Sequence, residues 1–139
     1  MGNPALHLAD LSRMDFRTSA VADQKNTELQ RSLQLDYRYQ PARIAIGLSL
    51  SNPQQPHAPA DVLGKPIRGE TLFGLEDVDL ALWLTLLSHH SGIGSPSRKQ
   101  VADLVASHWA RGIGMLAKDF LGNEAHPQDF LTGYATRQL

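Results

Sequence analysis

The segment that most constrains what this chain can fold into is QPARIAIGLSLSNP, at residues 40–53. Over residues 44–50, large aliphatic side chains alternate with alanine, glycine and serine, which is the period-2 pattern of a half-buried strand. The same residues also fit a short helix, because Pro41 is tolerated in a first turn and a helix apolar on most sides is stable when it is buried. Periodicity alone leaves both structures open.

The size of the chain and its apolar runs narrow the class of protein. Its 139 residues suit one domain with a modest core. The absence of cysteine excludes disulfides, thiolate metal sites and cysteine nucleophiles. The longest apolar run, at residues 80–87, is far below the ~20 residues needed to cross a bilayer, and the N-terminus shows no secretion signal. We therefore expect no membrane association and a cytoplasmic location.

The N-terminal part of the sequence predicts an arm, a strand and a helix. Residues 1–12 begin with Gly, Asn and Pro and predict a flexible arm. In RMDFRTS, at residues 13–19, apolar and polar side chains alternate as in a short strand. Ser19 suits the N-cap of a helix that runs to about Leu35, because its hydroxyl can accept a hydrogen bond from an unpaired N–H of the first turn.

The second part predicts a long loop and two main helices. Prolines and glycines crowd residues 51–69 and predict an irregular loop, and GETLFG at residues 69–74 predicts a short extended piece. Residues 75–90 predict a helix with acidic residues in its first turn. Ser95 as N-cap and Pro96 at the first helical position predict a last helix, which carries an apolar stripe and ends near Phe120.

Together these elements predict a mainly α fold, with a short N-terminal strand plus about four helices. The expected division of the chain is a flexible N-terminal arm at residues 1–12, a single mainly helical domain at residues 13–121, and a loosely held C-terminal tail at residues 122–139. No internal repeat is visible.

Charge does not identify a partner by itself. The chain has 13 Lys and Arg residues against 14 Asp and Glu residues. Nucleic-acid binding depends on how charge is distributed over one face and not on the sum. Most of the basic residues are Arg, which suits bidentate phosphate contacts but is equally common in surface ion pairs.

Four motifs, in this order, carry a family resemblance. The first, FRTS, has an apolar-basic-apolar-Ser form. The second, ARIAIGLSLSNP, is similar to a Cys-Arg-Ile-Gly-Phe-Cys-Leu-Ser-Leu segment, with Ala42 and Gly47 in place of the cysteines. The third, LFGLEDVDLALWLTLL, joins acidic residues to an apolar helix, and the fourth, SHWARGIGML, has a His-x-x-Arg-Gly pattern. Over roughly residues 16–118 the chain resembles DndE, the small subunit of the bacterial DNA phosphorothioation system, which replaces a non-bridging phosphate oxygen of the DNA backbone with sulfur. The matching residues are Arg17, Ser19, Arg43, Ile44, Leu48, Ser49, Leu50, Pro53, His108, Arg111 and Gly112.

The resemblance implies both a fold and a function. It implies that the opening segment is the second helix of a ribbon-helix-helix-like N-terminal unit. It also implies a homo-oligomeric, tetrameric protein that binds double-stranded DNA with a preference for nicks and works with the other phosphorothioation subunits. Some members of the family are similar to nicking endonucleases. Members that bind DNA are described as using a lysine-rich surface, whereas this chain has few lysines.

Basic residues near the N-terminus are candidates for phosphate contact. Arg13 and Arg17 lie on the expected outer side of the strand, where they either contact phosphates or only protect a solvated strand edge. Lys25, Arg31 and Arg38 extend the pattern along the first helix, but acidic residues are interleaved with them, which favours surface ion pairs.

Arg43 and Arg111 pose a different choice, because each lies beside apolar residues. A guanidinium is costly to bury without partners, so a structural role competes with phosphate contact. For Arg43 we expect a structural contact to an acidic partner such as Asp77 or Asp79. The candidate DNA-binding residues are Arg13, Arg17, Lys25, Arg31, Arg38, Arg43 and Arg111.

Two other function classes remain open. A metal-dependent nicking endonuclease needs clustered carboxylates, and Glu76, Asp77 and Asp79 form the only dense cluster, although a helix N-terminus explains them equally well. The strand-helix-helix order alone would also fit a ribbon-helix-helix repressor or antitoxin.

No catalytic residue, metal site or cofactor is predicted. A lone helical histidine such as His108 is usually a packing residue. His89 and His90 are adjacent and point in different directions on a helix, which makes a poor metal pair. The chain lacks a phosphate-binding loop of the P-loop type, so we expect no nucleotide hydrolysis.

Overall fold

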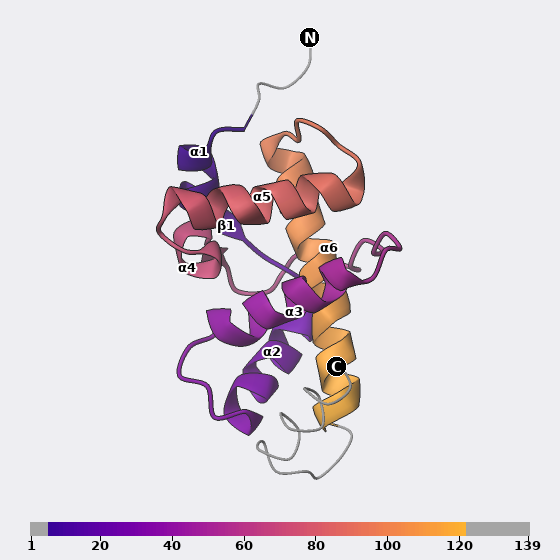
Figure 1. Ribbon diagram of the computed structural model, residues 1–139. Helices are drawn as coiled ribbons and strands as arrows, with labels where there is room; N and C mark the ends of the chain where they lie inside the picture. Colours follow the sequence, from indigo (N-terminus) through magenta and orange to yellow (C-terminus); the bar gives the residue numbers. More distant parts are fainter. Residues whose placement is uncertain (1–5, 122–139) are drawn as a thin grey trace.

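The computed structural model describes residues 6–121, which are mainly helical, as predicted. Figure 1 shows α3 and α5 crossing the front of the molecule, with α6 running lengthwise beside them. The predicted tail at residues 122–139 lies outside the described residues. In chain order the elements are α1 (Leu8–Arg13), β1 (Asp15–Phe16), α2 (Ala20–Ser32), α3 (Tyr39–Ser51), β2 (Ile67–Arg68), α4 (Gly69–Phe73), α5 (Asp77–Ser91), α6 (Arg98–Leu116) and the π-helical turn η1 (Ala117–Leu121).

The ambiguous segment is helix α3, so the helical interpretation is confirmed. Its buried residues Ala42, Ala45, Ile46 and Ser49 recur at intervals of three and four, which is the spacing of one helix face. Most of that face consists of small residues. Of the large aliphatic residues that produce the period-2 pattern, Ile46 is fully buried but Ile44 is 44% exposed, so that pattern does not mark the buried side.

Small residues also let α3 and α6 cross in close contact. A Cβ atom on Gly112 of α6 would lie 1.8 Å from the carbonyl oxygen of Ala45 on α3. Only glycine permits this approach, so the helix pairing depends on one position of α6.

The predicted N-terminal strand is present but short. Met14, Phe16 and Thr18 turn toward the interior while the residues between them are exposed, which confirms the expected alternation. β1 pairs antiparallel with β2, with Phe16 opposite Ile67. The strand, helix, helix order is present as β1, α2 and α3, but the partner strand belongs to the same chain and the ribbon is only two residues long.

Two segments differ from their predicted structure. Residues 8–12, part of the expected flexible arm, lie in α1, because Leu11 is fully buried there and packs into the core. GETLFG forms α4 and is not extended. A Cβ atom on Gly69 would lie 1.9 Å from the Leu11 carbonyl oxygen, so α1 and α4 support one another through a contact that a local pattern does not reveal.

The helix starts follow side-chain capping. The Ser19 hydroxyl accepts from the Ala22 N–H at 3.0 Å, which confirms the predicted N-cap of α2. For α6 the N-cap is Ser97 and not Ser95 as predicted, because Ser97 forms a reciprocal capping box with Gln100.

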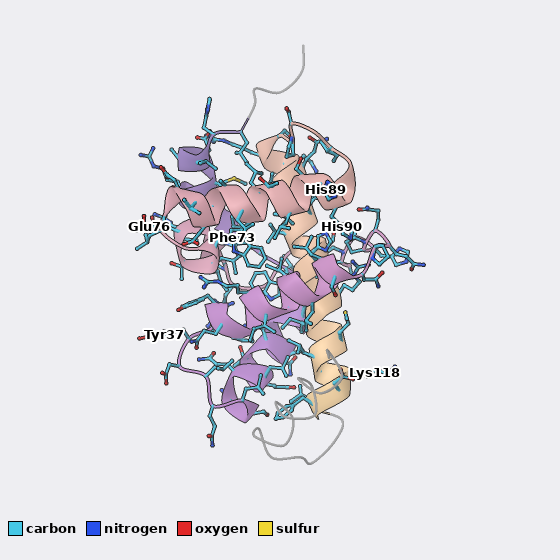
Figure 2. All side chains as sticks on the ribbon, viewed as in Figure 1. Tyr37, Phe73, Glu76, His89, His90 and Lys118 are labelled. Atoms are coloured by element: carbon cyan, nitrogen blue, oxygen red, sulfur yellow. The ribbon has the colours of Figure 1, made fainter. Side chains whose placement is uncertain are left out.

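The core lies between the helices and includes buried polar contacts. Trp109 is fully buried and donates its indole N–H to the Asn26 side chain at 3.1 Å. The Thr18 hydroxyl donates to the Ala106 carbonyl at 2.9 Å, which ties β1 to α6. Figure 2 shows Phe73 between α5 and α3. Among residues 6–121, no helix has both the length and the apolar character that crossing a bilayer requires.

Candidate nucleic-acid interface

Arg111, from the His-x-x-Arg-Gly pattern on α6, binds the C-terminal end of α3. Its Nε donates to the Ser49 hydroxyl at 2.7 Å, and its Nη2 donates to the Ser49 carbonyl at 2.6 Å. Its Nη1 donates to the Gln54 carbonyl at 2.7 Å. The last carbonyls of a helix lack intrahelical partners, and a cation there also complements the helix dipole. The guanidinium of Arg111 is therefore occupied inside the protein.

His108 joins the same cluster and is fully buried. Its Nδ1 lies 2.8 Å from the Ser49 hydroxyl oxygen. Burial, together with the neighbouring His90 and Arg111, lowers the pKa of His108 to about 4. The imidazole is neutral at physiological pH, which suits a buried site with a guanidinium beside it.

His90, near the end of α5, connects the loop after α3 to this cluster. Its Nε2 donates to the Asn52 carbonyl at 2.6 Å, and its ring packs edge-on against the His108 ring at a centroid distance of 4.7 Å. In Figure 2, His90 lies on the side of α5 that faces α3. His89 points elsewhere and lines a pocket, as expected for adjacent helical residues.

A serine oxygen within hydrogen-bond distance of an imidazole is the arrangement of an activated nucleophile and its base. Here Ser49 and His108 are both 0% exposed, so a substrate has no access to them. The cluster instead joins α3, α5 and α6, and it brings together the ARIAIGLSLSNP and SHWARGIGML motifs, in which Ser49 and His108 are 59 residues apart.

Arg43 also occupies its donors with backbone carbonyls. Its Nε donates to the Leu72 carbonyl at 2.7 Å and its Nη2 to the Thr71 carbonyl at 3.1 Å, both in α4. The guanidinium carbon lies 4.7 Å from the centre of the Tyr39 ring. The expected acidic partner is wrong, because the negative end of a short helix takes the place of a carboxylate.

Arg38 ties the turn before α3 to the loop before β2. Its Nη2 lies 2.6 Å from Asp23 Oδ1 in a partly buried ion pair and donates to the Lys65 carbonyl at 3.1 Å. This is the surface ion pairing that the interleaved charges of α2 indicated.

The other predicted DNA-binding residues lie at the surface. Arg13, Lys25 and Arg31 are exposed and form no ion pair with another residue of the described part of the chain. Arg17 is exposed and uses one N–H, from Nη1 to the Gly64 carbonyl at 3.0 Å. Arg17 lies four positions after Arg13, which is about 13 Å along an extended chain.

The fold adds two cations that sequence reasoning missed. Pairing of β1 with β2 places Arg68 opposite Asp15, in an exposed ion pair at 3.7 Å. Lys65 is exposed and follows Gly64, whose N–H donates to the Thr18 carbonyl. No local signal identifies these two residues, because their place depends on pairing between distant segments. We use the name basic surface for Arg13, Arg17, Lys65 and Arg68, which the β1–β2 pairing and the contact of Gly64 with Thr18 bring to one region of the fold.

The acidic cluster begins α5. Glu76 is the N-cap residue, and Asp77 and Asp79 lie in the first turn, as the helix-start interpretation predicted. All three are exposed. Within residues 6–121, no three His, Asp or Glu side chains are placed to hold a metal ion together.

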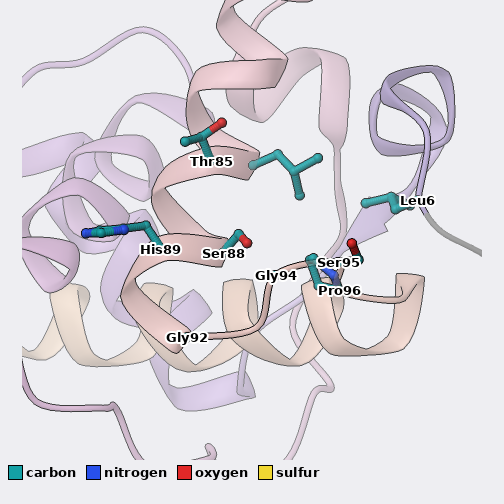
Figure 3. Close-up of a pocket in the computed structure, with 9 residues that line it drawn as sticks. Leu6, Thr85, Ser88, His89, Gly92, Gly94, Ser95 and Pro96 are labelled. Carbon is teal, nitrogen blue, oxygen red and sulfur yellow. The ribbon is translucent and has the colours of Figure 1, made fainter.

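An open pocket of about 570 Å³ lies between α5, the loop before α6 and Leu6. Figure 3 shows His89, Ser88 and Thr85 on its α5 side. The Ser88 hydroxyl already donates to the Ile93 carbonyl. His89 is the single titratable side chain among the described lining residues, so the pocket offers no set of catalytic groups.

Helix α5 exposes an apolar stripe. Val78 is 77% exposed, Leu82 54% and Leu86 41%, and these residues are four apart, so they share one face of the helix. Leu75, just before the helix, is 76% exposed. Exposed aliphatic residues that share a helix face make this face a candidate for contact with another protein surface. We call these four residues the α5 face.

Comparison with known proteins identifies a family. Residues 15–123 match the family described as DNA sulphur modification protein DndE. The match runs from β1 to the end of the described residues and includes both motifs of the buried cluster. No curated protein matches the chain.

Proposed function

Because the chain belongs to the DndE family and is thereby linked to DNA sulphur modification, we propose that it is the subunit that binds duplex DNA for this reaction. It contacts the DNA backbone, prefers nicked DNA, and has no catalytic role of its own. It works in the cytoplasm with the other subunits of the modification machinery.

The observation that carries this proposal is the basic surface. Its cations come from the end of α1, from the residue after β1 and from residues 65–68, and only Arg68 has a carboxylate partner among the described residues, in an exposed pair that is worth little. Each phosphate that such a residue neutralises releases counterions. Contacts of this type position a protein on DNA without reading sequence.

Two groups of predicted DNA-binding residues take different roles. Arg13, Arg17 and Lys25 contact phosphates directly, with Arg31 as a further contact near the other end of α2. The guanidinium donors of Arg38, Arg43 and Arg111 are bound to protein carbonyls and, for Arg38, to a carboxylate. We therefore assign these three residues a structural role and not direct phosphate contact.

Self-association places several basic surfaces together. The α5 face is apolar and exposed, and its burial between copies of the chain would stabilise an assembly by roughly 25 cal/mol per Å² of apolar area removed from water. We propose a homotetramer held in this way. In such an assembly the modest charge of one chain is repeated, which raises the affinity for a long polyanion.

The test compares matched charge removals. Arg17→Gln and Lys65→Gln remove cations of the basic surface, while Lys99→Gln removes one that is paired with Asp103 on α6. We expect each of the first two variants to weaken binding to a nicked duplex at low salt and to reduce the salt slope by about one, and Lys99→Gln to change neither. Equal behaviour of all three variants would remove the proposal.

A further inference from the structure

Two exposed aliphatic residues stand at the edge of the basic surface. Val62 is 50% and Leu63 is 76% exposed, in the loop between α3 and β2. Val21, in the first turn of α2, is 62% exposed. The neighbouring Ala20 N–H donates to the Asp61 carboxylate at 2.9 Å, which holds this part of the loop against the start of α2. We call Val62 and Leu63 the apolar tip.

The apolar tip is exposed although the loop that carries it is firmly bound. Asp61 Oδ1 also accepts from the Leu63 N–H at 3.0 Å, and the Gly64 N–H donates to the Thr18 carbonyl at 3.0 Å. The Lys65 N–H donates to Asp23 Oδ2 at 3.1 Å. Three consecutive residues therefore have fixed backbone positions, and the exposure of Leu63 is a property of the ordered loop.

Glycine at position 64 lets the loop lie directly on the chain before α2. A Cβ atom there would come within 2.9 Å of the Thr18 carbonyl oxygen and 2.8 Å of the Asp23 Cβ. The backbone of Gly64 therefore lies in direct contact with Thr18 and Asp23, and a larger residue at position 64 would not fit there. The preceding aliphatic side chains remain exposed at the surface.

Cations flank the apolar tip. Arg17 donates to the Gly64 carbonyl, and Lys65 follows Gly64 in the sequence, so two cationic residues lie next to the tip along the chain. Of the two nearby carboxylates, Asp23 pairs with Arg38, while Asp61 accepts two backbone N–H groups, which lower its pKa and keep it ionised. The border of the apolar tip thus has two cations against one carboxylate that is unpaired among the described residues. This net positive charge favours a nucleic acid over an apolar protein groove as the partner of the tip.

We infer that the apolar tip recognises the nick: Leu63, supported by Val62, packs against the base pair that the strand break leaves free to unstack, while Arg17 and Lys65 hold the flanking phosphates. Apolar side chains that enter a base step must unstack and kink the duplex. At a nick one backbone is already broken, so this deformation costs less than in intact DNA. The preference for nicked DNA then follows from DNA mechanics and needs no sequence readout. This inference rests on the proposed function.

The test uses two duplexes of one sequence, intact and nicked, with 2-aminopurine beside the nick. Stacking quenches this base, so insertion of Leu63 raises its fluorescence. For the full chain we expect tighter binding to the nicked duplex and a fluorescence increase on it. For Leu63→Ser we expect the ratio of the two affinities to fall by about fivefold or more and the increase to disappear, with intact-duplex affinity within about twofold of the original protein. Tyr37→Ser, which removes another exposed side chain, should behave like the original protein.

The remaining outcomes separate the two claims. If the original protein binds neither duplex, the proposed function fails and the inference falls with it. If it prefers the nicked duplex and Leu63→Ser keeps that preference, only the inference is overturned. If Leu63→Ser instead changes the mass of the assembly or its association with a protein partner, the tip is a protein contact and the inference is likewise wrong.

Discussion

Gly112 of α6 lies against the backbone of Ala45 of α3, and a Cβ atom on Gly112 would overlap the Ala45 carbonyl at 1.8 Å. The two helices meet again one turn away, where Arg111 and His108 bind Ser49. The family motifs of this chain thus converge on one helix crossing, which positions α2 and β1 and, through them, the basic surface.

Replacement of Gly112 by alanine tests this crossing. Because the added methyl group meets backbone and not a flexible side chain, α3 and α6 must move apart, and we expect a loss of roughly 2–4 kcal/mol in the free energy of unfolding. Gly114→Ala is the control on the same helix, since a Cβ there meets nothing within 4 Å. We expect that variant to be stabilised by about 0.5–1 kcal/mol, because alanine favours helix. Urea denaturation measures both, and equal values for the two variants would contradict the account.

The buried histidine predicts a dependence of stability on pH. The pKa of His108 falls from 6.5 to about 4 on folding, because burial and the nearby cations disfavour its charged form. Between pH 6.5 and about 4 the unfolded chain binds a proton that the folded chain does not. The free energy of unfolding should therefore decrease as pH falls through this range, by on the order of 3 kcal/mol from this residue, and the contribution should level off below pH 4.

Variants test whether His108 causes this dependence of the free energy of unfolding on pH. We expect His108→Gln to flatten the profile between pH 6.5 and 4, even where it lowers stability at every pH. Gly114→Ala, which removes no titratable group and meets nothing within 4 Å, should leave the shape of the profile unchanged. A profile of His108→Gln that parallels that of the original protein would show that another group titrates in this range.

The α5 face predicts how the assembly is held. Leu82→Glu places a charge in the middle of the exposed apolar stripe, so association through this face would bury an unpaired carboxylate. Light scattering coupled to size exclusion should show a shift from an oligomer to smaller species, with the helical circular dichroism retained. Val62→Glu, on the apolar tip, is the matched control and should keep the original mass. An unchanged mass for Leu82→Glu would place the interface elsewhere.

Most of the secondary structure was predictable because the signals are local. Ser19 caps α2 through its own hydroxyl, and residues 77–91 carry an acidic start and an apolar body. The helical state of α3 followed from the family resemblance and not from periodicity, since its buried face consists mostly of small residues such as Ala42 and Ala45.

What the sequence could not predict depends on contacts between distant segments. α1 and α4 exist because Leu11 and Gly69 pack together. Lys65 and Arg68 join the basic surface only because β2 pairs with β1. The sequence places Arg43 and Arg111 beside apolar residues and leaves a structural role and phosphate contact as alternatives, and the helix ends that bind them become apparent only in three dimensions.

The most direct test of the central claim is a salt titration of binding to a nicked duplex and to the same duplex intact, followed by fluorescence anisotropy in the presence of EDTA. If the basic surface contacts phosphates, the nicked form is bound more tightly and the affinity for both falls steeply with salt, with a slope that reflects several released counterions. Absence of binding to either duplex at low salt would contradict the account.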